Sequence, residues 1–259
     1  MWACCWVCLD DVVGVMHLHD VVYIICRHSS AVRRFSTITH QRLSDIVVKG
    51  LREPWDIAGC DVTSQIYIAD NWDCIWRVSS DGEDADHWLP NLPSDKISPW
   101  SLSLTSSRLL VTSLFPRQLI QFDAEVGDKL RCIPLPDYMF PYHAVESPTG
   151  TFIVSHLNTQ LNEDQISQVS TEGQVLRQFS GSVDWAQHVA VDSYGNIFVA
   201  DSGNSRVLLL DAQLALRRVI VDEHQLNHNK PRRLFYTEQS GQLLVVLDYS
   251  VAVFDVLCR

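Results

Sequence analysis

Two histidines and an aspartate stand at equivalent positions of an internal repeat, and their side chains are of the types that bind metal ions. Asp56 lies in PWDIAG, His143 in PYHAVE and His188 in WAQHVAVD. Imidazole nitrogens and carboxylate oxygens are ligands for Zn²⁺, and carboxylates also bind Ca²⁺. Side by side, the three would form a zinc or calcium site and suit a metal-dependent hydrolase or lyase. In the alternative, which we favour, they hydrogen-bond neighbouring strands and the protein holds no cofactor.

Aromatic residues cluster around the same repeat positions. Trp55, Trp100 and Tyr142 each come directly before one of them, and Trp72, Phe140 and Trp185 are expected at the same end of the sheets. Grouped aromatic side chains are typical of binding surfaces, because they bury a large area at a small cost in side-chain entropy. They also fill gaps between sheets in repeat proteins, which is the alternative. We predict a binding surface made by a set of five aromatic residues: Trp55, Trp72, Trp100, Phe140 and Tyr142.

The repeat that places these residues runs along the whole chain. Its equivalent positions are Gly14, Asp56, Ser101, His143, His188 and Arg233, which by subtraction lie about 42, 45, 42, 45 and 45 residues apart. Each unit contains short runs of Val, Ile, Leu and Phe, separated by Gly, Asn, Asp and Ser, which indicates strands joined by tight turns. The clearest unit is 185–211, WAQHVAVDSYGNIFVADSGNSRVLLLD. Four-stranded repeats of this length are typical of β-propellers.

The sequence therefore predicts an all-β fold, a six-bladed β-propeller that forms a single domain over 1–259. The blades are expected at roughly 10–51, 52–96, 97–138, 139–183, 184–228 and 229–259. The last unit ends before a fourth strand, whereas an apolar run at 2–9 precedes the first unit. Because an unpaired edge strand invites aggregation, we expect this N-terminal run to complete the last blade. Cys4 or Cys5 would then lie near Cys258, and a disulfide would form there only in an oxidising compartment.

The best units combine HVAVD, then GNIFVAD, then NSRVLLLD, and this pattern resembles the NHL repeat. Residues 185–211 match it best and 54–78 come next, while blade 3 has Thr112-Ser113 and blade 4 has Ser155-His156 where the repeat has Ala-Asp. The resemblance implies a six-bladed propeller like that of tripartite-motif (TRIM-NHL) proteins. It further implies a non-catalytic protein-interaction module, such as the substrate-recognition part of a ubiquitin-ligase-type protein. Enzymatic six-bladed relatives hold a metal in the central channel, which is the basis of the hydrolase or lyase alternative.

The composition of the chain limits the classes of partner that we expect it to bind. The chain has 259 residues, of which 46% are hydrophobic, and a formal net charge of −11. The loops expected beside the aromatic residues hold more acids than bases, so an RNA-binding propeller is disfavoured, since RNA binding needs a basic face. No apolar run is long enough for a membrane helix, and scattered cysteines suit a reducing compartment. We expect a cytoplasmic, monomeric domain that binds a protein partner over blades 2–4 and no membrane.

Overall fold

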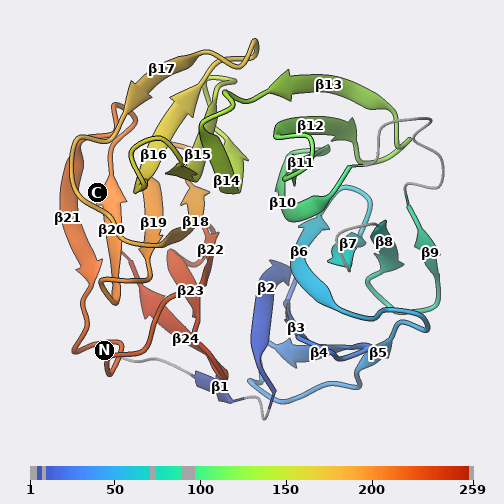
Figure 1. The fold of residues 1–259 in the computed structure, drawn as a ribbon. Helices are drawn as coiled ribbons and strands as arrows, with labels where there is room; N and C mark the ends of the chain where they lie inside the picture. Colours follow the sequence, from blue (N-terminus) through green and yellow to red (C-terminus); the bar gives the residue numbers. More distant parts are fainter. Residues whose placement is uncertain (1–4, 8–9, 71–73, 89–96, 257–259) are drawn as a thin grey trace. The chain divides into compact units, whose positions relative to one another are not determined.

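Strands are the regular elements of this protein. The computed structural model describes all residues except 1–4, 8–9, 71–73, 89–96 and 257–259. Across the described residues the strands form six four-stranded antiparallel sheets, one for each predicted blade (Figure 1). The predicted fold class, an all-β six-bladed propeller, is confirmed. A search of the described residues for a helix able to cross a membrane finds none.

The first three blades follow the chain from the innermost to the outermost strand. Blade 1 contains β2 (Val12–Leu18), β3 (Val21–Cys26), β4 (Ala31–Ser36) and β5 (Ile46–Val47). Blade 2 contains β6 (Pro54–Cys60), β7 (Gln65–Asp70), β8 (Cys74–Ser79) and β9 (Ala85–His87). Blade 3 contains β10 (Pro99–Thr105), β11 (Arg108–Ser113), β12 (Gln118–Asp123) and β13 (Lys129–Pro134).

The other three blades repeat this order, with one exception at the end. Blade 4 contains β14 (Met139–Glu146), β15 (Phe152–Asn158), β16 (Glu163–Val169) and β17 (Val175–Gln178). Blade 5 contains β18 (Ala186–Val191), β19 (Ile197–Asp201), β20 (Arg206–Leu210) and β21 (Leu216–Val221). Blade 6 contains β22 (Arg233–Thr237), β23 (Gln242–Val246), β24 (Ser250–Asp255) and, as its outer strand, β1 (Cys5–Val7).

The chain divides into two compact units. The first unit is Asp10–Cys132 and holds blades 1 and 2 and most of blade 3. The second unit joins Met1–Leu9 to Ile133–Arg259 and holds blades 4 to 6.

The predicted N-terminal strand lies in the second unit. β1 pairs antiparallel with β24, with Trp6 opposite Val251, and the Trp6 side chain is buried. The prediction that the N-terminal run completes the last blade is therefore confirmed. Cys4 and Cys258 lie outside the described residues, so the disulfide between the termini stays a prediction.

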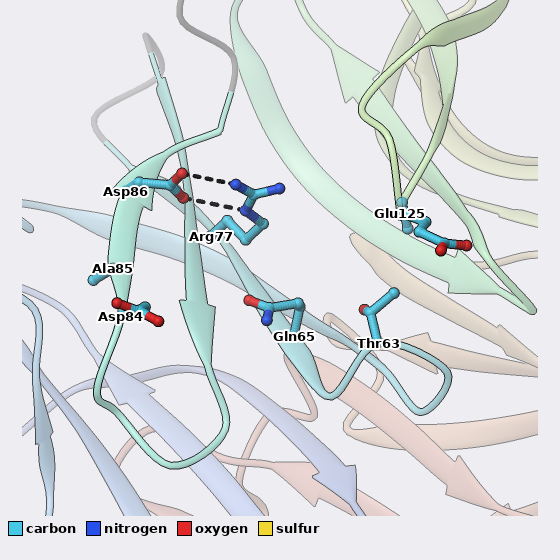
Figure 2. A pocket seen from close by; sticks show the side chains of 8 residues that line it. Thr63, Gln65, Arg77, Asp84, Ala85, Asp86 and Glu125 are labelled. Carbon is cyan, nitrogen blue, oxygen red and sulfur yellow. Dashed lines mark hydrogen bonds and ion pairs between the residues drawn. The ribbon is translucent and has the colours of Figure 1, made fainter.

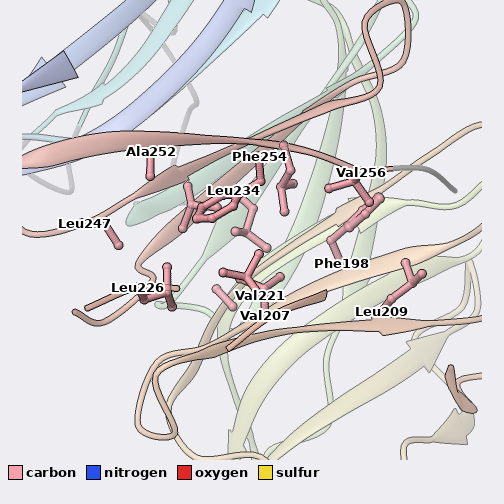
Figure 3. Close-up of a cluster of buried hydrophobic side chains, with 13 residues drawn as sticks. Phe198, Val207, Leu209, Val221, Leu226, Leu234, Leu247, Ala252, Phe254 and Val256 are labelled. Carbon is pink, nitrogen blue, oxygen red and sulfur yellow. The ribbon is translucent and has the colours of Figure 1, made fainter. Parts of the chain in front are cut away.

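Neighbouring blades of the second unit are joined by apolar layers. One layer lies between blades 5 and 6 (Figure 3), and its members include Phe198, Val207, Leu209, Val221, Leu226, Leu234, Leu247, Ala252, Phe254 and Val256. Every residue of β19 is buried, because both faces of this sheet are covered. Side chains alternate between the faces of a strand, so a strand covered on both faces is apolar throughout. This layer explains the uninterrupted apolar run in NIFVAD.

Candidate binding site

A β-bulge interrupts the first strand of five blades, at the residue before the repeat position. The pairing between the first and second strands shifts there by one residue. The bulged residues are Val13, Trp55, Trp100, Tyr142 and Gln187. A bulge leaves one residue out of the hydrogen-bonded ladder and turns its side chain to a new direction. Three of the five predicted binding residues therefore occupy positions at which the backbone redirects the side chain.

In the first unit the two bulged tryptophans contact each other. The rings of Trp55 and Trp100 are stacked, with centroids 5.0 Å apart and planes at 27°, and both side chains are half-buried. The guanidinium carbon of Arg27 lies 4.5 Å from the centroid of the Trp55 ring, and Arg27 Nε lies 3.5 Å from the Asp11 carboxylate. Aromatic stacking and a cation over an indole both stabilise this geometry. We call Arg27, Trp55 and Trp100 the Trp55 stack.

In the second unit Phe140 and Tyr142 meet edge to face, with ring centroids 6.2 Å apart. Phe140 pairs with Leu157, which pairs in turn with Asp164, so these residues form one row across three strands of blade 4. Burial raises the pKa of the Tyr142 phenol, and so do the charge of Asp164 and a hydrogen bond to its side chain. The Tyr142 hydroxyl is therefore a protonated donor to Asp164 at neutral pH.

The same carboxylate reaches the next blade. Asp164 Oδ2 accepts the backbone N–H of Trp185 at 2.6 Å, and Lys230 Nζ lies 5.7 Å from the centroid of the Trp185 ring. The Trp185 side chain is 50% exposed. Phe140, Tyr142, Asp164, Trp185 and Lys230 thus form a continuous surface along blades 4 and 5 and the segment before blade 6. We call it the Trp185 band.

The structure brings together the predicted aromatic residues as two pairs, Trp55 with Trp100 and Phe140 with Tyr142. Trp72, the fifth of the set, lies outside the described residues. Sequence reasoning counted Arg27, Asp164 and Lys230 among the loop charges beside the aromatic residues, but it did not predict their contacts with those residues. Arg27 follows the end of β3 and Asp164 lies near the start of β16, so both stand at strand ends, where a polar residue carries no distinctive sequence signal.

The two predicted histidine ligands lie against each other in the second unit. The rings of His143 and His188 are stacked with centroids 3.5 Å apart, and both side chains are buried. His188 Nδ1 accepts the backbone N–H of Leu234 at 3.4 Å, which leaves the proton on Nε2. Burial, followed by the charges of His143 and Arg233, lowers the pKa of His188 well below its usual value. The His188 imidazole is therefore neutral at pH 7, the form in which histidine binds metals.

Asp56 belongs to the first unit, where its carboxylate accepts hydrogen bonds from two backbone N–H groups. Oδ1 accepts the N–H of Ile57 at 3.0 Å and Oδ2 accepts the N–H of Leu102 at 2.9 Å. Asp56 and Leu102 are 46 residues apart, as are His188 and Leu234. In both cases a side chain at the repeat position bonds the first strand of the following blade. This is the structural role that we set against metal binding, and the metal site stays a prediction.

A polar pocket of about 380 Å³ lies elsewhere in the first unit, beside the outer strands of blade 2 (Figure 2). Its lining comprises Thr63, Gln65, Arg77, Asp84, Ala85, Asp86, Ala124 and Glu125. Arg77 donates to both carboxylate oxygens of Asp86, at 3.2 and 2.8 Å, and this hydrogen bonding raises the pKa of Arg77. The lining has no aromatic or apolar anchor beyond two alanines, so the pocket offers little area for burying a partner.

No family model matches the chain, and no curated protein matches its sequence. Solved structures do resemble it. The WD40 β-propeller domain of Doa1 is 14% identical with a TM-score of 0.68, over 98% of this chain and 96% of that one. Streptogramin B lyase is 14% identical with a TM-score of 0.68, over 93% and 78% of the two chains. A chain of the nidogen/laminin complex is 14% identical with a TM-score of 0.66, over 83% and 81%. At this identity the likeness shows the fold of the chain, a β-propeller.

Proposed function

We propose that the chain is a non-catalytic protein-interaction module that captures a protein partner through aromatic side chains set on β-bulges. One observation carries the proposal: Trp55 and Trp100, from successive blades, are stacked and half-buried at bulged positions. A pre-formed aromatic surface loses little entropy on binding, so more of its contact energy appears as affinity. The wide use of propellers as binding scaffolds fits this role but does not identify the partner.

The test combines partner capture with a stability measurement. The variant Trp55→Ala/Trp100→Ala should lose the proteins that the unmodified chain retains in a pull-down, while its Tm stays nearly unchanged. Val62→Ala is the matched control, because Val62 is 69% exposed and follows β6 at the end opposite Trp55. Retained capture, together with a fall in Tm as large as that of the buried-core variant Trp88→Ala, would show that the tryptophans are core residues.

The pair Phe140 and Tyr142 is expected to contribute to the same activity. Tyr142→Ala removes a half-buried ring and its hydrogen bond to Asp164, so capture should weaken while the blade remains folded. Tyr142→Phe keeps the ring and loses only the hydroxyl. Full capture by Tyr142→Phe and loss by Tyr142→Ala would assign the effect to the aromatic surface.

A metal-dependent hydrolase or lyase is the second candidate, favoured by the contact between two buried imidazoles, His143 and His188, of which His188 is neutral. Asp56 would be the third ligand, and Zn²⁺ or Ca²⁺ the ion. The chemistry that such an ion supplies is polarisation of a substrate oxygen. Elemental analysis of the purified protein tests the site directly. Stoichiometric metal that disappears in His143→Ala/His188→Ala would support it, and a metal-free, fully folded sample would exclude it.

The remaining expectations form part of the proposal. We place the module in the cytoplasm as a monomer, with an NHL-type role such as substrate recognition for a ubiquitin-ligase-type protein. The net charge of −11 opposes the capture of RNA. Filter binding at low salt should therefore retain no RNA pool, and retention of any pool would contradict a protein-specific module.

A further inference from the structure

Trp185 adopts a backbone conformation that bulky residues rarely take. Its φ is +51°, in the left-handed region, and its indole is half exposed to solvent. Left-handed backbone places the Cβ of an L residue close to a carbonyl oxygen, so glycine or asparagine is usual at such a position. The burial of the ring does not explain the presence of tryptophan here. Unfavourable backbone conformations at surfaces are concentrated in binding and catalytic sites.

The neighbouring strands hold this conformation from both sides. Asp164 Oδ2 accepts the N–H of Trp185 at 2.6 Å, and the Trp185 carbonyl accepts the N–H of Ser202 at 3.3 Å. Asp201 Oδ1 accepts the N–H of Asp184 at 2.8 Å, and the Asp184 carbonyl accepts the N–H of Gly203 at 2.8 Å. Three successive peptide groups, from 183–184 to 185–186, are thus bonded to blade 5, and the middle one is also bonded to blade 4. The backbone that carries the indole is therefore held in place before any partner arrives.

Acidic residues lie close to Trp185. Asp164 Oδ2 lies 2.6 Å from the backbone N of Trp185, and Asp184, which is exposed, directly precedes Trp185 in the chain. Glu163, which is exposed, precedes Asp164 in β16. Lys230 lies over the indole and supplies a positive charge. The carboxylates outnumber this cation, so the surface around Trp185 attracts cationic groups.

We propose that the Trp185 band is the docking surface for a basic, extended peptide segment of the partner. An apolar or planar side chain of the peptide packs on Trp185 and Phe140, and an arginine or lysine side chain meets the exposed Asp184. A guanidinium suits both tasks, because it stacks on aromatic rings and bonds carboxylates through two N–H groups. The peptide is extended because the band continues across blades 4 and 5. This proposal rests on the proposed interaction function and adds the chemistry of the partner.

Fluorescence anisotropy with labelled peptides tests the proposal. The probes are an arginine-rich decapeptide library and its counterpart with glutamate in place of each arginine. The arginine peptides should bind, more weakly as salt rises, and the glutamate peptides should not. Trp185→Ala should weaken binding by on the order of tenfold or more, as for an aromatic anchor. Tyr194→Ala, which removes an 83% exposed aromatic at the other end of β18, should bind as the unmodified chain does.

A second variant separates binding from folding. Glycine accepts a positive φ, so Trp185→Gly should keep or raise the Tm while it loses the arginine peptides. Equal binding of both libraries, no binding by the unmodified chain, or unchanged binding by Trp185→Ala would each overturn the proposal. A large fall in the Tm of Trp185→Gly would also overturn it, by making Trp185 a structural residue. If only these peptide results fail while Trp55→Ala/Trp100→Ala still loses the partner, the interaction function stands without this surface.

Discussion

Aspartates at the ends of second strands act as buried hydrogen-bond acceptors. Asp201 ends β19, is fully buried, and accepts from Asp184 N–H, Asn204 Nδ2 and Arg206 Nε. Asp70 ends β7 and accepts the backbone N–H groups of the segment before blade 2 and the indole N–H of Trp76. The Ala-Asp ending of the repeat therefore fixes the chain that enters each of these blades. In blade 3 the Ser113 hydroxyl takes this role by accepting the N–H of Ser98 at 3.2 Å.

Replacement of Asp201 should destabilise the protein strongly. Asp201→Ala leaves Arg206, Asn204 and the Asp184 N–H without their acceptor, and we expect a loss of about 2–4 kcal/mol in the free energy of unfolding. Urea unfolding followed by fluorescence measures it. The control is Asp86→Ala, which breaks the exposed pair with Arg77 and should cost less than about 1 kcal/mol. Equal losses for the two variants would contradict the buried-acceptor role.

His156 makes stability depend on pH. It stands where the repeat has aspartate, is buried, and bonds Ser167 Oγ through Nε2 at 2.8 Å. Burial lowers the pKa of His156 to about 4, from 6.5 for a solvated histidine. The unfolded chain therefore binds a proton first as pH falls below 6.5, so the folded state loses stability progressively down to about pH 4. The expected loss at pH 5 is on the order of 2 kcal/mol.

Urea unfolding at pH 7.5 and pH 5 should show this loss, and His156→Asn should reduce it. The pKa of His188 is also lowered by burial, so part of the pH dependence should remain in the variant. An unchanged pH dependence in His156→Asn would assign the effect to other groups.

At the scale of elements, the bulge in the first strand decides which residues can bind. All five bulged blades redirect the side chain before the repeat position, but only Trp55, Trp100 and Tyr142 are aromatic there. The bulge in blade 5 carries Gln187, and this blade instead presents Trp185, two residues earlier. The bulge is thus common to these blades, and the residue at the bulged position determines whether an aromatic side chain is redirected there.

Packing between neighbouring blades should dominate the stability of the elements. Phe198 in β19 is fully buried and stacks on Tyr236 of blade 6, with ring centroids 4.6 Å apart. Phe198→Ala should lower the free energy of unfolding by about 3–5 kcal/mol, through lost transfer energy and a cavity. Denaturant unfolding measures this, and the exposed Tyr194→Ala should differ from the unmodified chain by less than about 0.5 kcal/mol. A small effect of Phe198→Ala would mean that the layer between blades 5 and 6 repacks.

At the scale of the whole molecule, blade 6 is built from both ends of the chain. β1 covers the edge of β24, and Trp6 is buried in the contact. Removal of the chain through β1 should expose the N–H and C=O groups along β24, lower the Tm and promote association between copies. Light scattering and the denaturant midpoint test this, with Trp6→Phe as a variant that keeps the strand and an aromatic side chain. An unchanged midpoint and a monomeric truncated protein would show that the strand pairing is dispensable.

The sequence by itself determined the six blades, the inner strands and the strand from the N-terminus. Strands and turns are specified by local alternation and by Gly, Asn and Asp, and the rule that edges must be covered predicted the pairing of β1 with β24. The sequence also indicated that the residues before the repeat positions are candidate binding residues, because the 42–45-residue spacing makes these positions equivalent. The tertiary structure alone decided that Arg27 lies over Trp55, that Asp164 joins Tyr142 to Trp185, and that Trp185 has a positive φ. Arg27 and Trp55 come from different blades, as do Asp164 and Trp185. Trp55 and Tyr142 stand at bulges, which change side-chain directions that sequence periodicity does not encode.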